Sequence, residues 1–172
     1  MKCYEMFELK FSGPKPEGSW AETDITAMFQ CGADKKTVKG FYDGDGIYKV
    51  RFMPQQTGIY CWKVEGIVQA EGTEECTASD QSHGMVQAVD THFEYEDGAK
   101  YLPFGTTIYA LAHQTEDIIE QTLASLAEAP FNKVRHCIFP KHYDYNHNDP
   151  EFYPFEKNEE GKWDVHRPCL AY

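Results

Sequence analysis

Hydrophobic and polar residues alternate along several short stretches of the first half of the chain. Such alternation is typical of strands that bury one face only. The alternating positions are Phe7, Leu9 and Phe11; Ile25, Ala27 and Phe29; Tyr48, Val50 and Phe52; and Tyr60, Trp62 and Val64. A short run from Val38 to Tyr42 and a stretch around Cys76 add two further strands. Short strands at this spacing predict an antiparallel β-sandwich of the immunoglobulin-like type.

Two motifs in this half each allow two readings. Asp43-Gly44-Asp45-Gly46 is a hairpin turn or a calcium loop, but Pro54 stands where an EF-hand loop needs its glutamate, so we favour the turn. Gly58-Ile59-Tyr60 is similar to the tyrosine corner, in which the hydroxyl bonds to backbone upstream. The other reading of Tyr60 is an ordinary core side chain on a strand.

The spacing of hydrophobic residues changes in the second half of the chain. A hairpin with a two-residue turn at Asp97-Gly98 should place Phe93 opposite Leu102. The apolar run from Leu102 to Leu111 predicts a strand buried on both faces. A helix should follow from an N-cap at Thr115 until Pro130, and a second buried strand should cover 134–139.

This order of strand, helix and strand predicts a βαβ unit with parallel pairing. We expect two domains, a sandwich over 1–84 and an α/β unit over 85–172, with no strand after Pro140. Two parallel strands and one helix leave apolar faces and strand edges uncovered. The second domain therefore reads as the opening of a larger α/β domain, and its expected partner is either the chain that supplies the rest of that domain or another copy of itself.

Composition narrows the possible partners. The formal net charge of −12 argues against nucleic acid and against anionic membrane surfaces. No apolar run approaches the roughly 18 residues of a membrane span. The N-terminus lacks a signal sequence, so we expect a cytoplasmic location with six reduced cysteines. We expect no cofactor.

Two segments of the second half resemble a known group of enzymes. Pro130-Phe131-Asn132-Lys133-Val134-Arg135 resembles the second barrel strand of clan A retaining glycoside hydrolases, with Pro130 in place of glycine. Leu102 to Tyr109, followed by His113, looks like the first barrel strand of their apiosidase-like branch, with Thr106-Thr107 in place of Asp-Thr. The stretch from Phe41 to Pro54 is similar to a sandwich domain that commonly precedes such barrels.

The resemblance implies a (β/α)8 barrel, or TIM barrel, whose acid/base and nucleophile glutamates end the fourth and seventh strands. A retaining mechanism needs both carboxyls. Neither position falls within residues 1–172, and Glu116 and Glu120 lie on a helix outside the barrel. We therefore expect no catalytic residue in this chain.

The resemblance instead implies residues that contact the carbohydrate substrate or support the nucleophile. In clan A the arginine matching Arg135 bonds the nucleophile carboxylate; the other reading is an arginine paired with a structural acid. The loop 141–148 would lie at the barrel mouth, or would only pack on missing parts of the barrel. The candidate substrate-binding residues are Thr107, Tyr109, His113, Arg135, Lys141, His142, Tyr143 and Tyr145.

A metal site formed by His136, His142 and His147 with Cys137 or Asp144 is disfavoured, because the spacing is irregular and the strand neighbours His136 and Cys137 point to opposite faces. The function expected is that of the N-terminal fragment of a glycoside hydrolase acting on oligosaccharides. The alternative is a non-catalytic carbohydrate-binding or structural accessory module.

Overall fold

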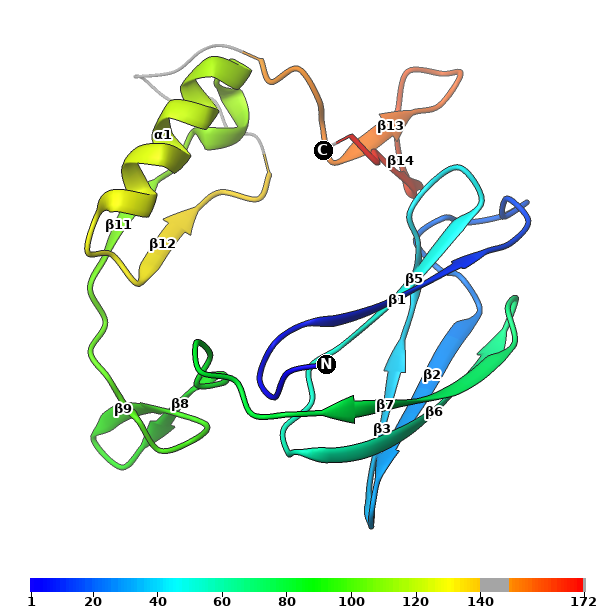
Figure 1. Ribbon diagram of the computed structural model, residues 1–172. Coiled ribbons are helices and arrows are strands. Elements are labelled where there is room, and N and C mark those ends of the chain that lie inside the picture. The colour runs from blue at the N-terminus through cyan, green and yellow to red at the C-terminus, as the bar shows by residue number, and fades with distance from the viewer. Residues whose placement is uncertain (140–148, 172) are drawn as a thin grey trace.

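The computed structural model describes residues 1–139 and 149–171, and is built mostly of antiparallel sheets (Figure 1). Its first elements are β1 (Phe7–Ser12), β2 (Ile25–Cys31), β3 (Asp34–Lys39), β4 (Phe41–Tyr42), β5 (Ile47–Phe52), β6 (Gly58–Gly66) and β7 (Ala70–Cys76). The later elements are β8 (Val86–Val89), β9 (His92–Tyr95), β10 (Lys100–Tyr101), β11 (Gly105–Ile108), η1 (Leu111–His113), α1 (Glu116–Glu128), β12 (Lys133–His136), β13 (Phe155–Lys157) and β14 (Trp163–Pro168).

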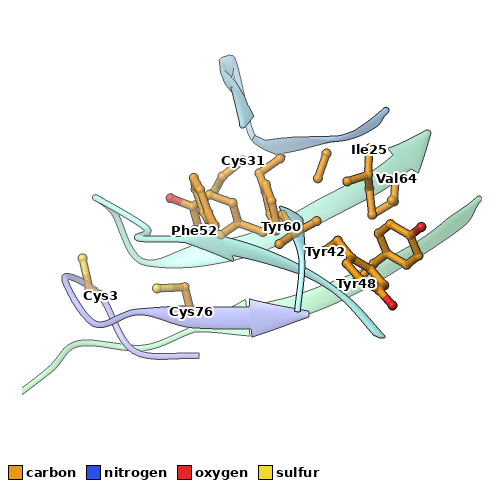
Figure 2. Packing of buried hydrophobic residues seen from close by; sticks show 12 residues of the cluster. Cys3, Ile25, Cys31, Tyr42, Tyr48, Phe52, Tyr60, Val64 and Cys76 are labelled. Atoms are coloured by element: carbon orange, nitrogen blue, oxygen red, sulfur yellow. The ribbon is translucent and has the colours of Figure 1, made fainter. Parts of the chain in front are cut away.

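The first seven strands form two sheets, as a sandwich requires. One sheet has the order β3-β2-β6-β7 and the other β1-β5-β4. Both enclose one core, in which the rings of Phe29 and Phe52 stack with centroids 4.1 Å apart. The predicted inward positions of β2 and β5 are buried. Figure 2 shows this core with Tyr42 and Tyr48 at one end and Cys3 and Cys76 at the other.

One predicted turn forms between β4 and β5, and one predicted strand is interrupted by a glycine. Asp45 has a positive φ between Gly44 and Gly46, and the chain turns there from β4 into β5, as predicted. The predicted strand from Val38 to Tyr42 is instead two strands separated at Gly40. A side chain at Gly40 would meet the Lys49 carbonyl, so glycine allows a close approach that ends β3.

The tyrosine corner does not form. The buried Tyr60 hydroxyl has no hydrogen-bond partner of normal geometry among the described residues. Burial raises the pKa of Tyr60, and the nearby backbone amide of Gln56 opposes that rise. Tyr60 is thus a core residue whose ring packs edge-on against Phe52.

The hairpin after the sandwich differs from the prediction in register. Tyr101, not Leu102, lies opposite Phe93. Tyr95 N–H bonds to the Ala99 carbonyl, so three residues form the turn, with the last of them, Gly98, at φ +84°. A third strand, β8, was not predicted and pairs with β9.

The strand–helix–strand unit has the predicted parallel pairing, because β11 and β12 align Thr106 with Val134. Thr115 occupies the N-cap of α1, although its side chain makes no capping bond. The prediction that both strands are buried is wrong: every residue of β12 is exposed, and α1 buries none of its residues. No element among the described residues covers the face of β11 and β12 that lies away from α1.

The chain after Pro140 also differs from the prediction, because β13 and β14 form an antiparallel hairpin. Asn158 organises its turn: the Asn158 carboxamide oxygen accepts the backbone N–H of Lys162 at 2.9 Å. The hairpin lies beside the sandwich (Figure 1), where Trp20 N–H bonds to the His166 carbonyl at 2.9 Å. Arg167 places its guanidinium 4.6 Å from the Trp20 ring centroid.

Nowhere in the described ranges does a helix reach the length and apolarity needed to span a bilayer.

Candidate functional site

The candidate site is built on the parallel pair β11–β12, whose register is fixed at its start by Asn132. The Asn132 carboxamide donates to the Leu102 carbonyl and accepts the Phe104 N–H, each at 2.9 Å. Asn132 N–H also bonds to the Phe104 carbonyl at 2.9 Å. Gly105 follows, and a Cβ there would collide with the Lys133 carbonyl. The strands β11 and β12 therefore pair in a single register.

This register divides the strand side chains between two faces. Thr106 and Ile108 line a groove of about 370 Å³ against Thr122, Leu126 and other residues of α1. Thr107 pairs with Arg135 in the register, so alternation places both on the face away from the helix. In a closed barrel this face would point inward.

Arg135 and Tyr109 are in contact on the face away from the helix. The Arg135 guanidinium lies 5.5 Å from the Tyr109 ring centroid, which is cation–π distance. Among residues 1–139 and 149–171, no carboxylate lies within ion-pair distance of Arg135. The structure thus brings together three of the predicted residues, Thr107, Tyr109 and Arg135. The ring of Tyr109 lies against the guanidinium of Arg135.

His113 is placed differently. It ends the turn η1, is only 6% exposed, and its backbone N–H bonds to the Ala110 carbonyl at 3.1 Å. A buried imidazole four residues beyond Tyr109 is positioned by the loop that leaves β11. No described contact joins it to Arg135.

The other four predicted residues lie outside the described residues. These are Lys141, His142, Tyr143 and Tyr145.

A second cavity lies where β11 leads through η1 into α1. It measures about 400 Å³ and is lined by Gln114, Glu116, Ile119, Glu151 and Phe152, among others. The sequence prediction missed Glu151 and Phe152, because no periodic element marks the segment that carries them. It also missed that Asn132 fixes the register between β11 and β12. The signal for this role in the sequence is the position of Asn132 between the helix and the following strand.

The described residues include no group of three or more histidine, cysteine, aspartate or glutamate side chains placed to hold a metal ion. His142, Asp144 and His147, which the sequence raised as metal ligands, lie outside the described residues.

Comparison with known proteins gives two matches. The family described as "Domain of unknown function (DUF5060)" matches residues 1–66, which are the first strands of the sandwich. A crystal structure of a "putative glycoside hydrolase" from Bacteroides vulgatus ATCC 8482 is 39% identical over 99% of this chain, with a TM-score of 0.88. No curated protein matched. The chain spans only 36% of that neighbour's length, so it is similar in sequence and fold to about one third of that protein.

Proposed function

We propose that this chain is the N-terminal part of a retaining glycoside hydrolase that acts on oligosaccharides. Its first unit would be an immunoglobulin-like sandwich, and its second the opening of a (β/α)8 barrel of the clan A, apiosidase-like type. The supporting observation is the parallel β11–β12 pair, crossed by α1 and open on its inner face. The neighbour of 39% identity carries nearly two thirds of its length outside the matched part, which leaves room for such a barrel.

The proposed barrel explains the exposed apolar side chains. Leu123, Val134 and Ile138 are 52%, 41% and 65% exposed, although each belongs to or borders a regular element. Burying a side chain of this size is worth about 1.5–3 kcal/mol. Further barrel strands and helices would cover them.

Arg135 would support catalysis rather than perform it. The Tyr109 ring holds the guanidinium in place, and no described carboxylate neutralises it. A nucleophilic carboxylate brought in by a later strand would accept hydrogen bonds from Arg135, and the positive charge would hold the pKa of that carboxyl low. Thr107 and Tyr109 lie on the same face and would contact the sugar with the loop 141–148.

One observation favours the alternative, a non-catalytic carbohydrate-binding or accessory module. The sandwich closes its own core, with Tyr48, Val50 and Ala27 fully buried, and needs no cover from elsewhere. The two functions separate by assay. A carbohydrate-binding module predicts that the 172-residue chain binds polysaccharide, whereas a structural accessory module predicts that it does not. Both predict no hydrolysis by a longer protein.

The experiment compares the 172-residue chain with a protein extended by the sequence that its gene encodes beyond Tyr172. On a panel of aryl glycosides we expect turnover only by the extended protein. In that protein Arg135→Ala should lower kcat by about a hundredfold, as the loss of one preorganised donor does. His136→Ala, on the opposite face of β12, is the matched control. Equal effects of both variants, or turnover by the short chain, would contradict the proposal.

A further inference from the structure

Trp20 is the point at which the sandwich holds the hairpin β13–β14. The Trp20 ring packs edge-on against the buried Tyr42, with ring centroids 5.6 Å apart, so the sandwich core sets its position. The Arg167 guanidinium of β14 lies 4.6 Å from the Trp20 ring centroid, which is cation–π distance. The backbone N–H of Trp20 donates to the His166 carbonyl at 2.9 Å. A ring contact and a backbone bond together attach β14 to the loop between β1 and β2.

Two further contacts orient the hairpin on the sandwich. The His166 Nδ1 lies within hydrogen-bond distance, 3.3 Å, of the Ser19 hydroxyl. A Cβ added at Gly44 would lie 2.8 Å from Leu170 Cδ1, so the Leu170 side chain rests on the turn between β4 and β5. These contacts come from two separate loops of the sandwich. They therefore restrain the rotation of the hairpin as well as its distance from the sandwich.

The hairpin in turn holds the segment that precedes it. The Tyr153 ring packs on the Trp163 ring of β14, with centroids 4.7 Å apart. The Tyr153 hydroxyl donates to the Asp149 carboxylate at 2.8 Å. The rings of Phe139, beyond the end of β12, and Phe155 of β13 stack with centroids 6.5 Å apart. The hairpin therefore contacts the chain that leaves β12 as well as the segment just before β13.

That segment supplies part of the cavity of about 400 Å³ beside the start of α1. Glu151 and Phe152 line the cavity together with residues of η1 and α1, and they directly precede Tyr153. Neither residue belongs to a helix or a strand. An irregular segment takes its order from the contacts that hold it. The position of this part of the cavity wall relative to α1 therefore depends on the hairpin.

We propose that Trp20 is a positioning residue: through the hairpin β13–β14, the sandwich holds the Glu151–Phe152 wall of this cavity in place beside α1. As a contribution to substrate binding, this role rests on the proposed function, in which the carboxyl ends of the barrel strands carry the active site. The carboxylate of Glu151 would accept hydrogen bonds from sugar hydroxyls, and the Phe152 ring, 42% exposed, would offer an apolar face to a sugar ring.

Hydrogen exchange of the 172-residue chain tests the positioning role without any substrate. Trp20→Ala removes the ring but keeps the backbone N–H that donates to His166. We expect amides of 149–154 and of β14 to exchange about tenfold faster or more, because the cation–π contact and its packing are lost. Trp20→Phe keeps a ring against Tyr42 and Arg167 and should restore most of the protection.

Trp62→Ala is the matched control, because Trp62 packs within the sandwich, where its ring lies 6.3 Å from that of Phe11. It should leave the exchange of 149–154 at the native rate even where it weakens the sandwich. Unchanged exchange of 149–154 in Trp20→Ala would overturn the proposal. Equal acceleration by Trp62→Ala would overturn it as well, because the effect would then be general destabilisation.

Kinetics of the protein extended beyond Tyr172 test the contribution to substrate binding. On an oligosaccharide, Trp20→Ala should raise KM about tenfold and keep kcat within about twofold, since the wall would contact the sugar but not the reacting atoms. Trp20→Phe should return KM towards the native value. An unchanged KM would contradict this part of the proposal. If the extended protein shows no turnover, the proposed function fails, and hydrogen exchange still decides whether Trp20 holds the wall.

Discussion

The exposed apolar surface of α1 and β12 should drive association of the 172-residue chain. The exposed apolar side chains concerned are Ile118, Leu123, Val134, Ile138 and Phe139, which are 41% to 65% exposed. Since about half of each side chain is already covered, completing the burial is worth about 1 kcal/mol per residue, or about 5 kcal/mol in all. That amount corresponds to between a thousandfold and ten-thousandfold in an association constant, before the costs of binding.

The perturbation is the double variant Ile118→Glu with Leu123→Glu. It removes about 2 of the 5 kcal/mol, so self-association should weaken by about thirtyfold for each copy at the interface. Sedimentation equilibrium over a concentration series measures the dissociation constant. The matched control is Ile59→Glu, which adds a charge at a residue 58% exposed on β6 of the sandwich.

Hydrogen exchange provides the second measurement and the refutation. If the surface is left uncovered, amides of β11, α1 and β12 should exchange much faster than those of β2 and β6. A chain that stays monomeric at the highest concentration, with strong protection across 105–136, would show that this unit is stable alone. The barrel interpretation would then lose its physical basis.

Three further predictions concern the sandwich. Phe29→Ala should lower the free energy of unfolding by about 3–5 kcal/mol in urea denaturation, while Phe104→Ala, at a residue 54% exposed, should cost far less. The hydrogen bond from Arg51 lowers the pKa of Glu8, so its contribution to stability is present above the carboxyl's unfolded pKa and is lost as the pH falls through the lower folded value. Glu8→Gln should flatten that acid limb of the thermal midpoint against pH. Gly66→Ala, at φ +112° with no room for a Cβ, should cost more than about 1 kcal/mol.

The fold was predictable where one-sided burial controls the pattern. Ile25, Ala27 and Phe29 alternate because β2 has one face on the core, and a period of two is unambiguous there. The parallel pairing of β11 with β12 followed from a helix lying between two strands. The hairpin β13–β14 was missed because its order comes from Asn158 in the turn and from Trp20 far away in sequence, neither of which produces a periodic pattern.

The burial of β11 and β12 was mispredicted for a related reason. A continuous apolar run indicates that a strand will be covered on both faces, but not which part of a protein covers it. In this chain α1 lies over one face but leaves a groove of about 370 Å³ there, and Leu102 and Phe104 remain 67% and 54% exposed just before β11. The described residues therefore leave much of the apolar run uncovered.

The candidate site shows the same division between local and long-range information. Alternation within 133–136 fixes the face on which Arg135 lies, but its neighbours depend on the register against a strand about thirty residues upstream. That register is set by Asn132 and by the space left at Gly105, and a shift of one residue would replace Thr107 with Thr106 beside the guanidinium. In the observed alignment the Tyr109 ring centroid lies 5.5 Å from the Arg135 guanidinium. Arg135 thus has a ring on one side and no described carboxylate within ion-pair distance, which is the arrangement that the proposed nucleophile would require.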